Sequence, residues 1–148
     1  MTIILVKEGI KMEIIRVGGW VFYVDEGIVN FDEHKVGKWM YYFDNYEFVS
    51  KICEEAVKTS VVCEAKHSDA EKGVACFYLN SDDIEEHKKV LQFFLDNNLI
   101  RRTKTGRLYN ISFKLDDQTR AGEYGSDFNA EIKLDTFINL ETGEWKFM

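Results

Sequence analysis

The residues of this sequence best suited to chemistry are lysines and a tyrosine that lie on short apolar-alternating runs late in the chain. Lys66 and Tyr78 belong to consecutive runs, 61–67 and 73–80, and Lys114 lies near the end of a later run. Antiparallel pairing of these runs would bring the three side chains onto neighbouring strands. Ammonium and hydroxyl donors gathered in one place suit a phosphate or a carboxylate, so we predict an anion-binding site there.

Further residues extend this predicted site. Lys66 is the candidate catalytic residue, and the ligand-binding candidates carry a positive charge, a hydroxyl group or a phenol. They are Lys38, Lys72, Tyr78, Lys114, Thr119, Arg120 and Tyr124. The alternative interpretation is that these lysines are solvated and protect a sheet edge against aggregation.

Hydrophobic periodicity indicates the elements that would position these residues. Residues 38–115 contain four apolar-alternating runs and two helical runs, in the order strand, helix, strand, strand, helix, strand. The first helix spans about 45–59, and the second begins at Asp82, where Glu85 completes a capping-box-like pattern. The expected inner positions are Phe48, Val49, Ile52, Cys53, Ala56 and Val57 in the first helix, and Ile84, His87, Leu91, Phe94 and Leu95 in the second.

Shorter runs flank this core on both sides. A hairpin is expected over 12–25, and short strands are expected over 130–147. In the run 108–115, Tyr109, Ile111, Phe113 and Leu115 should face inward. We therefore predict one α+β domain over 1–148, a curved antiparallel sheet of about seven to eight strands with both helices on one face. The other face must be solvated, covered by loops or used for binding.

Composition and charge narrow the class of protein. The 148 residues are 45% hydrophobic and 30% charged, which is typical of a globular protein. The net charge of −7 argues against broad nucleic-acid or membrane binding, although it allows a local basic pocket. Cys53, Cys63 and Cys76 form no C-x-x-C pair, so buried free thiols in a reducing, cytoplasmic location are expected.

The remaining motifs give weaker indications of function. The three histidines have no zinc-like spacing, so no metal site is predicted. A basic hairpin is expected over 100–107, and its cations are interpreted as a charged turn rather than a nucleic-acid patch. The basic residues of the hairpin are Arg101, Arg102, Lys104 and Arg107.

Trp39 would stack a base if it lined the concave face of the sheet, and would otherwise belong to the core.

The stretch Gly37-Lys-Trp-Met-Tyr-Tyr-Phe, followed by a helix and by Glu-Ala-Lys66, resembles the basophilic leukaemia expressed protein family. The run from Lys114 to Tyr124 is similar to that family's K-x-D-x-x-T-x-x-G-x-Y pattern. The resemblance covers residues 37–124. It implies a fold like that of the cap-binding translation initiation factor 4E. It says more about the fold than about the function.

The order of elements is also similar to that of bacterial phosphothreonine lyases. In this resemblance Lys66 matches the lysine that removes the Cα proton, and Tyr78 matches a tyrosine on the following strand. Lys114 and Arg120 match cations that hold the phosphate. The implied reaction is a β-elimination with Lys66 as base. The lyases carry a histidine acid in a K-x-H pattern, whereas this chain has Lys38-Trp-Met40, and methionine cannot donate a proton.

Three functions follow as hypotheses. The first is a non-catalytic protein that binds a phosphate-bearing ligand such as a nucleotide, an RNA end or a phosphopeptide. The second is a phospholyase-like enzyme in which His34 or His67 replaces the missing acid. The third is an acidic protein-interaction module, of the inhibitor or immunity type known in bacteria and phages, whose charge would steer a basic partner. No cofactor is predicted for any of the three.

Overall fold

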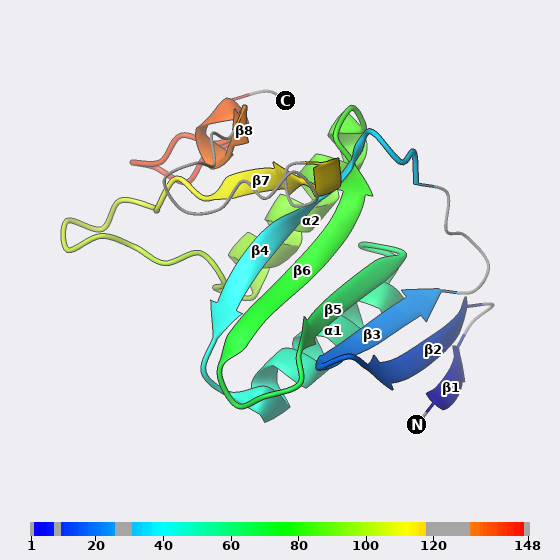
Figure 1. Cartoon of the computed structure of the whole chain (residues 1–148). Helices are drawn as coiled ribbons and strands as arrows, with labels where there is room; N and C mark the ends of the chain where they lie inside the picture. Colours follow the sequence, from blue (N-terminus) through cyan, green and yellow to red (C-terminus); the bar gives the residue numbers. More distant parts are fainter. Residues whose placement is uncertain (1, 8–9, 26–30, 118–130, 147–148) are drawn as a thin grey trace.

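The computed structural model describes residues 2–7, 10–25, 31–117 and 131–146. Within them an eight-stranded sheet carries the helices α1 and α2 (Figure 1). No described helix is long and apolar enough to cross a membrane. The elements are β1 (Thr2–Lys7), β2 (Ile10–Val17), β3 (Trp20–Asp25), β4 (Val36–Phe43), α1 (Tyr46–Lys58), β5 (Glu64–Ser68), β6 (Gly73–Asn80), α2 (Ile84–Asp96), β7 (Ser112–Leu115), β8 (Ile132–Lys133) and the 3-10 helix η2 (Leu134–Thr136).

The sheet has the strand order β1-β2-β3-β5-β6-β4-β7-β8, and its neighbouring strands pair in antiparallel fashion. From β4 to β7 the chain follows the predicted order of strand, helix, strand, strand, helix and strand. The predicted α+β class, with about seven to eight strands and two helices, is therefore confirmed. The strand β1 was not predicted, because the apolar run of 2–6 lacks alternation.

Strand alternation sorts the side chains of β4 and β6 between the two faces of the sheet. Trp39 and Phe77 face the helices, which lie behind the sheet in Figure 1. The Phe77 ring packs edge-on against Phe94 of α2, with ring centroids 5.1 Å apart. Their strand neighbours Lys38 and Tyr78 point to the opposite side, which we call the open face.

Side-chain caps determine where the two helices begin. The Asn45 side chain accepts a hydrogen bond from the Phe48 amide at 3.0 Å and caps α1. Asp83, rather than the predicted Asp82, caps α2. The reason is that the Asp82 carboxylate instead accepts from Lys35 Nζ at 2.8 Å.

Most predicted inner positions of the helices are buried, but Leu95 is only half-buried and two others are exposed. Phe48 and Ile84 are 39% and 50% exposed. Each lies in the first turn of its helix. Val90 and Phe93 of α2 are buried as well, so the apolar stripe of α2 is wider than the sequence pattern indicated. The confirmed positions are Val49, Ile52, Cys53, Ala56, Val57, His87, Leu91 and Phe94.

The predicted strand over 108–115 is correct only in its second half. β7 begins at Ser112, and Tyr109 is half-exposed instead of facing inward. The Leu108 amide donates to the Leu140 carbonyl at 2.9 Å, so this part of the chain pairs with the C-terminal segment. The predicted C-terminal strands are likewise reduced to β8, η2 and an isolated bridge between Ile138 and Trp145.

The cysteines agree in part with the prediction of buried thiols. Cys53 and Cys76 are buried, whereas Cys63 is half-buried and precedes β5. Partial burial raises the pKa of the Cys63 thiol to about 11, so the thiol is neutral near pH 7.

A buried polar link joins the sheet to α2. The Trp39 indole N–H donates to His87 Nδ1 at 3.0 Å, so His87 carries its proton on Nε2. That nitrogen donates to the Ser81 carbonyl at 2.8 Å. Both side chains are fully buried, and burial lowers the pKa of His87 below its ordinary value. Protonation of Nδ1 would remove the acceptor that Trp39 uses.

This link should make stability depend on pH. The unfolded chain takes up the His87 proton near pH 6.5, whereas the folded protein takes it up only at lower pH. Neutral His87 therefore makes its full contribution to the free energy of unfolding above about pH 6.5. This contribution decreases as the pH falls, by at most about 1.4 kcal/mol per pH unit for one proton. In urea unfolding between pH 7 and 5, His87→Gln should show a shallower pH dependence than the wild type. An equally steep dependence would contradict this account.

Candidate functional site

Four of the predicted site residues come together on the open face. Lys38 on β4 is the register partner of Tyr78 on β6 and of Lys114 on β7. Lys66 on β5 is the register partner of Cys76, which lies two residues from Tyr78 and on the same face. Neighbouring strands are about 4.8 Å apart. We call Lys66, Tyr78, Lys38 and Lys114, which follow one another across four adjacent strands, the lysine row.

Aromatic side chains surround Lys66. Its Nζ lies 3.9 Å from the centroid of the Trp20 ring and 5.5 Å from that of Phe22, both on β3. The Tyr78 ring is 5.9 Å away. An ammonium group over an indole face is attracted by the ring's negative face. The sequence interpretation missed Trp20 and Phe22, although their alternation with Val21 and Tyr23 was a usable signal.

The other members of the row are more deeply buried. Lys38 and Lys114 are each 7% exposed, and Tyr78 is 6% exposed. Lys38 Nζ donates to Asp116 Oδ1 at 2.7 Å, which compensates for the burial of its charge. Burial raises the pKa of Tyr78 far above its ordinary value, so its phenol remains a hydrogen-bond donor at neutral pH.

The open face of β5, β6, β4 and β7 has an excess of positive charge. Its charged side chains are the three lysines of the row and Glu64, and Asp116 follows β7. Burial raises the pKa of Glu64, and the charge of Lys66 opposes that rise. Three cations and two carboxylates therefore meet in a protein whose net charge is −7.

The remaining predicted site residues are not in the row. Lys72 lies in the exposed turn between β5 and β6, six residues before Tyr78 in the sequence and about 20 Å along the strand. Thr119, Arg120 and Tyr124 lie outside the described residues. Among the described residues, the structure also contains no group of acidic, histidine and cysteine side chains that could hold a metal ion.

Trp39 and the histidines lie elsewhere. Trp39 belongs to the core, so it cannot stack a base on the open face. His67 follows Lys66 on β5 and points to the helix side, where its Nε2 accepts from the Tyr23 hydroxyl at 3.0 Å. Burial lowers the pKa of His67, and its Nδ1 donates to the Ser68 carbonyl. His34 is exposed and lies 3.2 Å from Asp117.

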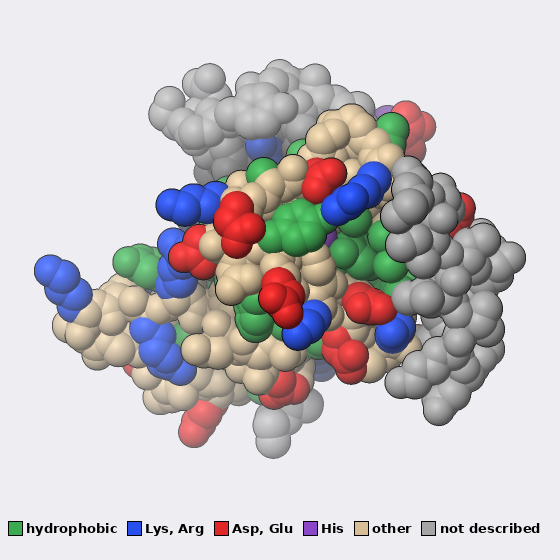
Figure 2. All heavy atoms as spheres, turned by 90° about the horizontal axis from the view of Figure 1, so that it is seen from below, with side chains coloured by type: hydrophobic (Ala, Val, Ile, Leu, Met, Phe, Trp, Pro, Cys, Tyr) green, Lys and Arg blue, Asp and Glu red, His purple; other side chains and the backbone are tan. Residues whose placement is uncertain are grey.

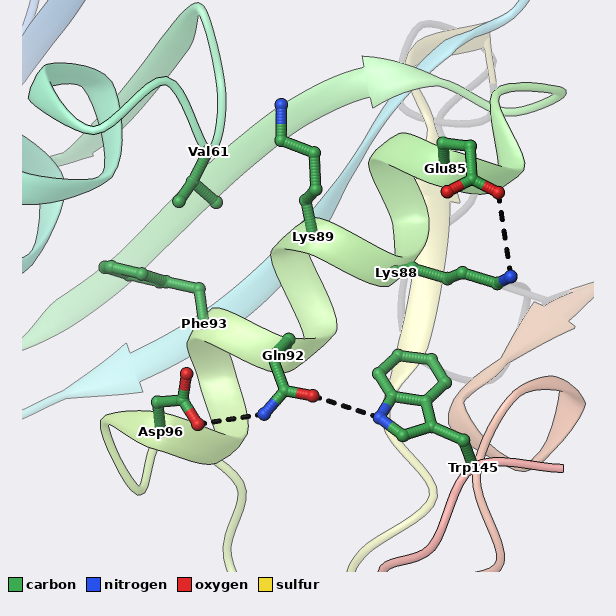
Figure 3. Close-up of a pocket in the computed structure, with 8 residues that line it drawn as sticks. All are labelled: Val61, Glu85, Lys88, Lys89, Gln92, Phe93, Asp96 and Trp145. Carbon is green, nitrogen blue, oxygen red and sulfur yellow. Dashed lines mark hydrogen bonds and ion pairs between the residues drawn. The ribbon is translucent and has the colours of Figure 1, made fainter. Parts of the chain in front are cut away.

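A separate hollow of about 490 Å³ lies along α2 (Figure 3). Most of its polar groups are engaged with one another. Gln92 accepts from the Trp145 indole at 3.0 Å and donates to Asp96 at 2.8 Å, while Lys88 pairs with Glu85. Few of the polar groups that line this hollow are therefore available to a ligand.

The pair of Lys38 and Asp116 should matter more for stability than an exposed ion pair. Asp116→Asn keeps the shape of the side chain but leaves a buried ammonium group beside a neutral amide, and should lower the free energy of unfolding by about 1–3 kcal/mol. Asp82→Asn, in the exposed pair with Lys35, is the matched control and should have a much smaller effect. Urea unfolding measures both. Equal effects would show that burial of Lys38 does not strengthen its dependence on Asp116.

Comparison of the sequence with models of protein families and with curated proteins gives no match. The family resemblance and the nature of the ligand therefore remain predictions. The function has to be argued from the side chains of the open face.

Proposed function

We propose that this protein binds a phosphate-bearing ligand on the open face of its sheet. The observation that carries the proposal is the lysine row, in which three ammonium groups and one phenol lie on four consecutive strands. Lys66 and Tyr78 lie on adjacent strands, about 4.8 Å apart, and can reach different oxygens of one phosphate group. The helices pack on the other face and do not block this one (Figure 1).

Lys66 should make the first contact with the ligand. It is half-buried, whereas Lys38 and Lys114 are each only 7% exposed. The two buried lysines contribute mainly through their charge, which acts more strongly in a partly desolvated place than in water. Tyr78, between Lys66 and Lys38 in strand order, supplies a neutral O–H donor.

The aromatic residues beside Lys66 favour a nucleotide over a bare phosphate. Trp20 and Phe22 are half-buried on the open face, next to the ammonium group. Stacking of a base on such a ring contributes about 1–3 kcal/mol. Trp20 thus takes the role that the sequence pattern allowed for Trp39. A ligand that combines a ring with phosphate would use both features of the site.

The surroundings of Lys66 support binding rather than β-elimination. A general base must be neutral when it removes a proton, whereas the Trp20 ring attracts the charged form of lysine. A general acid must lie on the same face as the base, and His67 points to the other face. Met40 lies on the open face two residues from Lys38 and has no proton to donate.

Calorimetric titration with nucleoside mono-, di- and triphosphates and with inorganic phosphate tests the proposal. We expect saturable binding that is tighter for nucleotides, and Lys66→Ala should weaken it about tenfold or more because a charge-assisted contact is lost. Lys72→Ala removes a lysine from the exposed turn and should leave the affinity unchanged. Absence of binding by every ligand, or equal losses in the two variants, would refute the proposed site.

A phosphorylated peptide separates binding from catalysis. A phosphothreonine peptide incubated with the protein should keep its mass, because the described open face lacks a histidine acid beside Lys66. Loss of phosphoric acid from the peptide, detected by mass spectrometry and abolished in Lys66→Ala, would establish the lyase hypothesis in its place.

A further inference from the structure

A basic arm projects from the molecule at the far end of β4 from the lysine row. Residues 100–109 form this arm, at the left of Figure 1, and Lys and Arg side chains gather on it in Figure 2. The arm contains no carboxylate, and all four of its cations are exposed. Among the described residues, Arg107 is the only one of these cations that lies next to a carboxylate, that of Glu141 at 3.4 Å. The four cations are Arg101, Arg102, Lys104 and Arg107.

Hydrogen bonds within the arm stabilise its turn. The Thr103 amide donates to the Arg107 carbonyl at 2.7 Å, and Gly106, with φ +88°, turns the chain. Arg102 donates from Nη1 to the Gly106 carbonyl at 2.8 Å. A preorganised arm loses less conformational entropy when a ligand binds than an unstructured one would.

Two tyrosines lie at the base of the arm with much of their surface exposed. Tyr42 of β4 is 59% exposed and Tyr109 is 50% exposed. Arg101 connects them, since its guanidinium donates to the Tyr42 carbonyl at 3.2 Å and its own carbonyl accepts from the Tyr109 amide at 2.9 Å. The tyrosines are therefore held close to the cations of the arm.

A hollow of about 280 Å³ lies between these tyrosines. It forms because β7 pairs with β4 only over 37–39, so β4 has no β7 partner beyond Trp39. Its volume lies slightly below the range of about 300–1,000 Å³ that is typical of small-molecule sites. Its lining residues are Met40, Tyr41, Tyr42, Leu99, Arg101, Tyr109 and Ile111.

We propose that the arm and the two tyrosines bind a short stretch of single-stranded nucleic acid. Exposed rings beside a row of cations are typical of such sites, because the rings stack bases and the cations contact phosphates. An acidic peptide would use the cations and leave the tyrosines without a function. A long duplex is disfavoured because, beyond the arm, acidic and basic side chains are interspersed on the view of Figure 2. This site uses none of the lysine row and does not depend on the function proposed above.

Fluorescence anisotropy with a labelled oligothymidylate of about eight nucleotides tests this proposal on the full chain. We expect binding at low salt that weakens as salt increases, with a slope of log affinity against log salt of about −2 for three phosphate contacts. Lys104→Ala combined with Arg107→Ala should reduce the affinity about tenfold and make the slope shallower by about 1.4. Lys88→Ala combined with Lys89→Ala, on α2, is the matched control and should change neither quantity.

The tyrosine variants separate a nucleic acid from a generic anion. Tyr109→Ala should weaken binding about tenfold without changing the salt slope, and Tyr109→Phe should retain the affinity because the ring remains. A glutamate-rich peptide should not compete with the oligonucleotide. No binding at low salt, full affinity in a folded Tyr109→Ala variant, or equal competition by the peptide would each overturn the proposal.

Discussion

The antiparallel register of β4 with β6 is the constraint on which the rest of the structure depends. It places Trp39 beside Phe77 on the helix side, and Lys38 beside Tyr78 on the open face. Because side chains alternate, a slip of one residue would bring a lysine into the apolar core and a tryptophan into the site. The free energy of such a slip is prohibitive, since an unpaired charge buried in a core costs several kcal/mol.

Two contacts hold β4 in this register. The indole of Trp39 donates to His87, which ties the strand to α2 at a fixed position. The second contact is on the edge of β4 that pairs with β7. There a Cβ atom on Gly37 would lie 2.6 Å from the Phe113 ring. Only glycine allows that approach without a shift of its neighbours. The same pairing aligns Lys38 with Lys114, so the packing of the core also positions the cations of the open face.

Much of this arrangement was predictable from the sequence, and the reason is periodicity. Alternation indicated the strands of the core, helical spacing indicated α1 and α2, and their order indicated that Lys66, Tyr78 and Lys114 would share a region. Which face carries Trp39 was not predictable, because alternation separates the two sets of side chains without saying which set meets the helices. Trp20 was overlooked for a different reason: its alternation with Val21 was visible in the sequence, but its place beside Lys66 follows only from the pairing of β3 with β5. The exposure of Tyr109 depends on the pairing of Leu108 with Leu140, a contact that local pattern does not contain.

The central claim is that the open face, at the lysine row, binds a phosphate-bearing ligand. Two-dimensional amide NMR of the ¹⁵N-labelled protein, titrated with a nucleoside triphosphate, tests it most directly because it locates the ligand without altering the protein. The account predicts saturable shifts centred on the amides of Phe22, Lys66, Cys76 and Tyr78, with little change in α1 and α2. Shifts centred on the hollow along α2, or no saturable shifts at millimolar ligand, would contradict it.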